Sequence, residues 1–113
     1  MAEKSHEDTH KEFKEAVNMT AGQLEKFLET EESKGVGWHN EGEVEAVGHQ
    51  SGRMIADILH KKSSDLTDDD YHQMSRVVSY VHRHVAQGGP KDDKEHSRWR
   101  YSLMNWGHDP LKH

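Results

Sequence analysis

The residues of this chain best suited to bind an anion are its five arginines, and all of them lie in the second half of the sequence. They are Arg53, Arg76, Arg83, Arg98 and Arg100. Residues 1–45 carry five lysines against twelve acidic residues, a balance of −7, whereas residues 46–113 carry ten basic and nine acidic residues, a balance of +1. Arginine is the preferred donor for phosphate and carboxylate groups. An anionic partner is therefore expected to bind the second half of the chain.

The clearest pattern is a stripe of polar side chains on one expected helix. His72, Arg76, Ser79 and Arg83 are spaced by four, three and four residues, which places them on one side of a helix. Basic residues of neighbouring helices would extend this stripe into a basic face. The full set of candidate phosphate-binding residues is Arg53, Lys61, Lys62, Arg76, Arg83, Arg98 and Arg100. The alternative is an ordinary solvated surface, in which these side chains pair with nearby acids such as Asp57, Asp92, Asp93 and Glu95.

A second pattern interleaves basic and aromatic residues at positions 97–101, as a surface that stacks single-stranded nucleic acid would. On a helix, however, Trp99 points about 100° away from the arginine on either side of it. Trp99 then shares a face with Leu103 and Trp106, and we predict that this face belongs to the core.

The sequence shows no arrangement typical of catalysis or metal binding. His82 and His84 are two residues apart, so on a helix they lie on opposite sides and cannot share one metal ion. Gly48 to Gly52 has the order G-x-x-S-G within an expected helix, whereas a nucleophile elbow is G-x-S-x-G after a strand. We therefore predict a non-enzymatic protein with no metal site and no cofactor.

The composition sets the limits of the fold. At 113 residues, with 31% hydrophobic and 32% charged, the chain has room for one domain with a thin core. The formal charge of −6 argues against overall attraction to nucleic acid, although eleven histidines would reduce it as the pH falls. The absence of cysteine excludes disulfides. No apolar run approaches the ~20 residues of a membrane span, so we expect an intracellular protein, cytoplasmic or associated with nucleoid or nucleus, without a membrane partner.

Amphipathic segments without strand-like alternation predict the fold class: all-α, a compact bundle of about five helices. The chain is predicted to form a single helical domain over residues 1–113, with residues 1–5 and 109–113 mobile. Helices are expected at residues 6–18, from 20 to between 30 and 33, at about 43–62, at 67–87 and at about 92–106, with a loop at 34–42. We expect the first two helices to pack as a pair and the third and fourth to form the centre.

Several residues mark the ends and the close contacts of these helices. Thr20 followed by Gln23 is a capping-box pair, and Thr67 followed by three aspartates is the strongest helix start in the chain. Gly48 and Gly52 each cost about 1 kcal/mol relative to alanine inside a helix. We therefore expect another backbone to approach the third helix at this point, with a kink as the alternative.

The buried faces follow from the helical spacing of the apolar residues. The side chains expected in the core are Phe13, Ala16, Val17, Leu24, Phe27, Leu28, Val44, Val47, Ser51, Ile55, Ile58, Leu59, Tyr71, Met74, Val78, Val81, Val85, Trp99, Leu103 and Trp106.

Four segments resemble a known family. They are Gly48–Arg53, Asp65–Asp70, Tyr80–His84 and Ser97–Pro110. With them, the chain resembles a domain-of-unknown-function family of small bacterial and fungal proteins whose members often carry the label "DNA-binding protein". The resemblance covers nearly the whole chain and implies DNA as a partner. Relatives carry more lysine and arginine after residue 34 and around Met54 and His60, so the resemblance implies weaker duplex binding here.

These observations lead to two alternative functions. The first is a weak, non-enzymatic nucleic-acid-binding protein that contacts phosphates through the basic face. The second is a protein–protein interaction module, in which the acidic N-terminal helix pair docks on a basic protein partner. An exposed apolar patch around Phe13 and Phe27 would favour the second.

Overall fold

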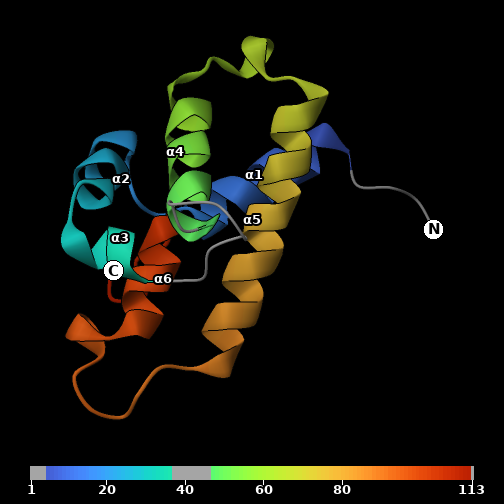
Figure 1. Ribbon diagram of the computed structural model, residues 1–113. Coiled ribbons are helices and arrows are strands. Elements are labelled where there is room, and N and C mark those ends of the chain that lie inside the picture. Colours follow the sequence, from blue (N-terminus) through green and yellow to red (C-terminus); the bar gives the residue numbers. More distant parts are fainter. Residues whose placement is uncertain (1–4, 37–46, 113) are drawn as a thin grey trace.

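The computed structural model describes residues 5–36 and 47–112, and over these residues the protein is an all-helical bundle (Figure 1). The α-helices are α1 (His6–Ala16), α2 (Ala21–Leu28), α3 (Glu31–Gly35), α4 (Val47–His60), α5 (Asp68–Gln87) and α6 (Arg98–Asn105), with short 3-10 helices η1 (Ser63–Asp65) and η2 (Lys94–His96). The predicted all-α fold class is confirmed. None of the described helices has the length and apolar character needed to span a bilayer.

The helix starts that the sequence marked most clearly are confirmed. Thr20 Oγ1 accepts a hydrogen bond from the Gln23 backbone N–H at 3.1 Å, and Gln23 Oε1 accepts one from the Thr20 N–H at 3.0 Å. Thr67 and Asp70 form the same reciprocal box at the start of α5. At the other end of α5, Gly88 adopts φ 73° and ψ 161°, a positive-φ conformation in which glycine carries no steric cost.

The short helix α3 occupies residues where we predicted the end of the second helix and the start of a loop. Thr30 Oγ1 accepts a hydrogen bond from the Ser33 N–H at 3.1 Å and so caps α3, which extends through Lys34 and Gly35. These two residues are therefore helical rather than part of a loop. The remainder of the expected loop, at 37–42, and residues 43–46 of the expected third helix lie outside the described residues.

The last helix begins later than predicted. Asp93 has a left-handed backbone (φ 49°), and the extended backbone of Ser97 (ψ 150°) separates η2 from α6. Ser97 then caps α6 by accepting a hydrogen bond from the Arg100 N–H at 3.1 Å. The continuous helix that we expected at 92–106 is thus a 3-10 turn followed by a two-turn helix.

The helices pair differently from our expectation. α1 packs along α5 and α2 packs along α4, so the first two helices do not form an isolated pair. α6 contacts α2, α3, α4 and α5, and within the described residues α4 and α5 are linked through α6 and the core rather than by packing along their length (Figure 1).

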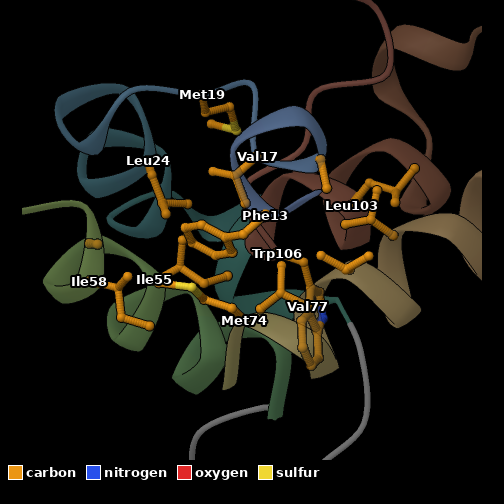
Figure 2. Packing of buried hydrophobic residues seen from close by; sticks show 14 of the residues in the cluster. Phe13, Val17, Met19, Leu24, Ile55, Ile58, Met74, Val77, Leu103 and Trp106 are labelled. Atoms are coloured by element: carbon orange, nitrogen blue, oxygen red, sulfur yellow. The ribbon is translucent and has the colours of Figure 1, made fainter. Parts of the chain in front are cut away.

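Side chains from the five helices α1, α2, α4, α5 and α6 fill the centre of the bundle (Figure 2). Phe13 of α1 is 1% exposed and lies among Ile55 of α4, Met74 of α5 and Trp106. Most of the predicted core residues are buried. Val47, Leu59, Tyr71 and Trp99 are only partly buried, Val85 is 42% exposed, and Val44 lies outside the described residues.

Gly52 lies where another backbone approaches α4, as its place in the sequence predicted. A Cβ atom at this position would lie 2.7 Å from the backbone oxygen of Asn105 and 2.5 Å from Leu28 Cδ2. The close approach therefore explains the glycine at position 52, whereas a Cβ at Gly48 would make only ordinary contacts of 3.4–3.6 Å with the side chains of Trp106 and Asn105.

Replacing Gly52 by alanine should lower the free energy of unfolding by about 1–3 kcal/mol, because the overpacking cost exceeds the helix-propensity gain of ~1 kcal/mol. Gly22→Ala is a matched control, since nothing lies within 4 Å of a Cβ at Gly22. This control should stabilise the protein by about 0.5–1 kcal/mol. Urea denaturation measures both, and a stable Gly52→Ala protein would contradict the close approach.

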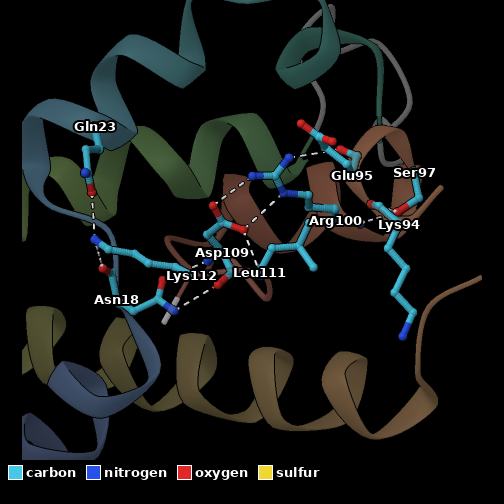
Figure 3. A network of polar contacts seen from close by, with 9 residues as sticks. All are labelled: Asn18, Gln23, Lys94, Glu95, Ser97, Arg100, Asp109, Leu111 and Lys112. Carbon is cyan, nitrogen blue, oxygen red and sulfur yellow. Dashed lines mark hydrogen bonds and ion pairs between the residues drawn. The ribbon is translucent and has the colours of Figure 1, made fainter.

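The C-terminal segment is attached to the N-terminal half by hydrogen bonds (Figure 3). Asn18 Nδ2 donates to the Asp109 carbonyl oxygen at 2.9 Å, and the Asp109 N–H donates to Asn18 Oδ1 at 2.8 Å. Lys112 Nζ donates to Gln23 Oε1 at 2.9 Å. Residues 109–112, which we expected to be mobile, thus carry specific contacts that fix the end of the described chain beside α2.

Candidate nucleic-acid interface

Two of the seven candidate arginines and lysines share one groove. Arg76 and Arg83 lie on α5 and line a groove of about 470 Å³ whose other polar lining residues are His72, Ser75 and Ser79. Spacings of three and four residues bring all five to the same side of the helix. Val47 at the start of α4, Tyr80 of α5 and Trp106 after α6 complete the wall.

The guanidinium groups of Arg76 and Arg83 are exposed and available. Arg76 Nη1 donates to the neutral Gln73 Oε1 at 3.2 Å, and neither arginine forms an ion pair with a residue that the structure describes. The alternative of self-paired surface arginines therefore does not apply to these two. Charged guanidinium groups without a carboxylate partner keep their capacity for charge-assisted hydrogen bonds to phosphate.

Arg100 is engaged elsewhere. Its Nε and Nη2 donate to the two carboxylate oxygens of Asp109 at 3.0 and 2.9 Å, and its Nη1 donates to the Glu95 carbonyl oxygen at 3.0 Å (Figure 3). Both side chains of the pair are less than one-fifth exposed. The guanidinium thus anchors the C-terminal segment, and we do not include Arg100 in the candidate interface.

The lysines after α4 stand at the turn between α4 and α5. Lys61 Nζ donates to Asp70 Oδ2 at 2.8 Å, and this hydrogen bond is the main reason that the pKa of Asp70 is lowered. Lys61 is thus paired with the carboxylate that also caps α5, while Lys62 is exposed beside it. Neither residue lines the groove of Arg76 and Arg83.

Arg53 lies in a different groove, between α2 and α4. This groove, of about 550 Å³, is also lined by three acidic residues, Glu25, Glu29 and Asp57. Arg98 is exposed on the first turn of α6 and lines neither groove. The seven residues predicted to form one basic face therefore lie on separate parts of the surface, and of these seven only Arg76 and Arg83 share a groove.

One lining residue, Ser75, was absent from our sequence-based set although a signal for it existed. From Tyr71 to Gln87 the sequence contains no aspartate or glutamate, but it contains two arginines and three histidines. In a chain of net charge −6, such a run marks a locally positive surface. Read together with helical spacing, the run would have selected Ser75 alongside the predicted Ser79.

The apolar end of the groove is built from stacked rings. Tyr80 stacks on Trp106 with ring centroids 4.2 Å apart and on His84 with centroids 5.1 Å apart. Burial raises the pKa of Tyr80, in spite of a hydrogen bond with Ser102 that lowers it. The stack of Tyr80 on Trp106 thus packs α5 against the residue that follows α6.

Acidification should destabilise the protein, beginning with His84. Burial lowers the pKa of His84 below its ordinary value of 6.5, so near that pH the unfolded chain binds a proton that the folded protein does not. The free energy of unfolding then falls as the pH drops through about 6.5. Denaturation at pH values of about 7.5 and 5.5 should show this loss, and His84→Gln should reduce it.

A second loss should follow at lower pH. Burial alone would raise the pKa of Asp109, but hydrogen bonds from Arg100 and from the Leu111 N–H outweigh it and lower this pKa below 3.8. The stabilisation is present above the unfolded value and is lost as the pH falls through the folded value. The exposed His96, whose pKa is raised mainly by its hydrogen bond with Asp93, acts in the opposite direction but is screened by solvent.

The chain was compared with known protein families, with curated proteins and with solved structures. Residues 12–104 match a family described as protein of unknown function (DUF3140). A search of curated proteins and a search of solved structures each found no match. The family description names no ligand, so the DNA partner implied by the resemblance stays a prediction.

Proposed function

Since the chain belongs to the DUF3140 family of proteins of unknown function, we propose its function from the geometry of α5: it is a non-enzymatic protein that binds nucleic acid through phosphate contacts. The observation that supports this is the shared groove of Arg76 and Arg83, on a helix face without acidic residues. Arginine and serine side chains are common phosphate donors in protein–DNA complexes. The groove offers two of each.

The spacing of these donors suits an extended polyanion better than a single small anion. Arg76 and Arg83 are seven residues apart, which corresponds to about 10.5 Å along the helix axis. Ser79 lies between them, and Ser75 lies beside Arg76. Donors spread along a line favour a ligand with repeated phosphates. The net charge of −6 elsewhere limits the affinity, so weak binding is expected.

A titration of labelled DNA at salt concentrations of about 50 and about 200 mM tests this function. Binding should weaken steeply with salt and strengthen from about pH 7.5 to about pH 6 as histidines charge. Arg76→Ala/Arg83→Ala should weaken binding at least about tenfold and reduce the salt slope by about two.

The matched control removes two positive charges from another surface. Lys26→Ala/Lys34→Ala has the same net charge as the arginine variant, but these residues lie on α2 and α3 and do not line the α5 groove. It should keep nearly all of the binding. No binding of any DNA at low salt and pH 6, or equal binding by both double variants, would contradict the proposed function.

The alternative of a protein-interaction module has less support. It would be favoured by an exposed apolar patch around Phe13 and Phe27, but Phe13 is 1% exposed and Phe27 is 9% exposed. Both rings belong to the core, against which α1 and α2 are packed. These two rings therefore do not form the exposed apolar patch whose side chains could serve as anchors of a protein–protein interface.

A further inference from the structure

We infer that the nucleic acid bound by α5 is B-form duplex DNA, with the exposed face of this helix lying in the major groove. This inference rests on the proposed function and narrows its partner from nucleic acids in general to one form. Two observations support it: the dimensions and hydrogen-bond donors of the exposed face fit the major groove, and the described aromatic rings are engaged in contacts within the protein.

The exposed face of α5 forms a continuous stripe without acidic or bulky apolar side chains. It consists of His72, Ser75, Arg76, Ser79, His82, Arg83, Ala86 and Gln87, all of which are exposed. At 100° per residue these positions fall within about 140° of the helix circumference, and at 1.5 Å per residue they extend over about 22 Å. α5 itself runs along one side of the bundle (Figure 1). The stripe therefore presents one side of a long helix to a partner.

These dimensions fit the major groove of B-form DNA. An α-helix with its side chains is about 10–12 Å across, and the major groove is about 12 Å wide. The major groove of A-form RNA is too narrow for side chains to read. The stripe also carries suitable chemistry, since arginine, glutamine and serine donate both to phosphates and to acceptors on base edges.

Acidic residues limit where along α5 the DNA can lie. Asp68 and Asp69 are exposed in the first turn of the helix, and Asp92 and Asp93 are exposed after its end. Phosphates close to either pair would be repelled. Ser79 is near the middle of the interval between the two pairs, and Arg76 and Arg83 lie on either side of it. The centre of contact is therefore placed at Ser79.

Single-stranded nucleic acid fits this surface poorly, because its binding proteins offer aromatic faces on which bases stack. The aromatic side chains that the structure describes are engaged within the protein. Phe13, Phe27 and Trp106 are buried in the core. The tyrosines stack on other rings: Tyr80 on Trp106 and His84, Tyr71 on His6, and Tyr101 on Phe27. Trp99 contacts Gly89 and donates its Nε1–H to the His84 carbonyl oxygen. The described part of the chain thus provides phosphate donors without a stacking platform.

Binding of matched ligands of about 20 nucleotides or base pairs tests this inference: a DNA duplex, each of its strands alone and an RNA duplex of the same sequence. At about 50 mM salt the DNA duplex should bind at least about tenfold more tightly than either strand or the RNA duplex. Protection of guanine N7 from methylation should accompany binding, because N7 faces the major groove.

A bulky residue at the centre of the stripe distinguishes duplex binding through the major groove from binding of single strands. Ser79→Tyr keeps the charge of the protein, and because Ser79 is exposed the fold should be retained, as a melting curve would verify. The ring should block entry into the groove, lowering duplex affinity by about tenfold while leaving single-strand binding equal or stronger. Val85→Tyr is the matched control, since Val85 is exposed on the same helix but outside the stripe, and it should leave duplex binding unchanged.

The outcomes separate this inference from the proposed function on which it rests. Single strands or the RNA duplex binding as tightly as the DNA duplex, or unprotected guanine N7, would overturn duplex binding through the major groove and leave phosphate binding intact. Failure of all the ligands to bind would overturn the proposed function itself. Preference for the DNA duplex, N7 protection and selective loss in Ser79→Tyr would together support the inference.

Discussion

Replacing Trp106 by alanine should lower the free energy of unfolding by at least about 3 kcal/mol, as truncation of large buried aromatic side chains does. Trp106 is 7% exposed and stacks on Tyr80 with centroids 4.2 Å apart. It also ends α6, since its N–H donates to the Leu103 carbonyl oxygen at 3.0 Å. Its removal would open a cavity where the rings that support α5 meet the core.

Denaturation by urea, followed by circular dichroism, measures this change. Trp106→Phe keeps a ring that stacks on Tyr80 and should cost clearly less than the alanine variant. Trp99→Ala is a second control, because Trp99 is only partly buried. An unchanged melting temperature of Trp106→Ala would show that this ring is not part of the core and would make it a partner contact.

Replacing Asn105 by leucine should cost about 2–5 kcal/mol, because it leaves two buried polar groups of α3 without partners. Asn105 is 1% exposed and Ser33 is fully buried. The Ser33 hydroxyl donates to Asn105 Oδ1 at 2.5 Å, and Asn105 Nδ2 donates to the Ser33 carbonyl oxygen at 3.0 Å. This reciprocal pair is a polar contact between α3 and α6, and leucine keeps the branching of the side chain at Cγ, with a larger volume, while removing both bonds.

A double-mutant cycle isolates the contribution of this pair. Ser33→Ala alone should cost about 1–3 kcal/mol, since Asn105 Oδ1 loses its donor. The combination Ser33→Ala/Asn105→Leu should cost less than the sum of the single changes, because fewer polar groups remain unpaired. Strict additivity in urea denaturation would contradict a direct coupling between these two residues.

The arginine predictions show which features of a binding surface can be predicted from the spacing of residues along a helix. The spacing of His72, Arg76, Ser79 and Arg83 follows from helix geometry alone, and the structure places all four in one groove. Arg100 and Lys61 are cationic like Arg76 and Arg83. However, Arg100 pairs with Asp109 and Lys61 pairs with Asp70. Those pairings depend on how separate segments approach each other, and this is not encoded in spacing along one helix.

The sequence by itself determined the helical class and most helix ends, because these features depend on interactions over three or four residues. Thr20, Thr67 and Gly88 mark their helix termini through hydrogen bonds or backbone angles that are local. The break at Asp93–Ser97 was not marked as clearly, since a left-handed aspartate requires support from the surrounding fold. Helix boundaries were predictable to the extent that their causes lay within one turn.

Only the tertiary structure decided which helices pair and which basic side chains remain available. α1 lies on α5 and α2 on α4, because Phe13 and Leu24 bury their side chains against partners far along the chain. The free energy of such burial depends on the summed fit of many side chains, which no local pattern contains. The same packing brings Asp109 to Arg100 and, among the described residues, leaves Arg76 and Arg83 without an ion pair, so the position of the candidate interface is a consequence of the fold.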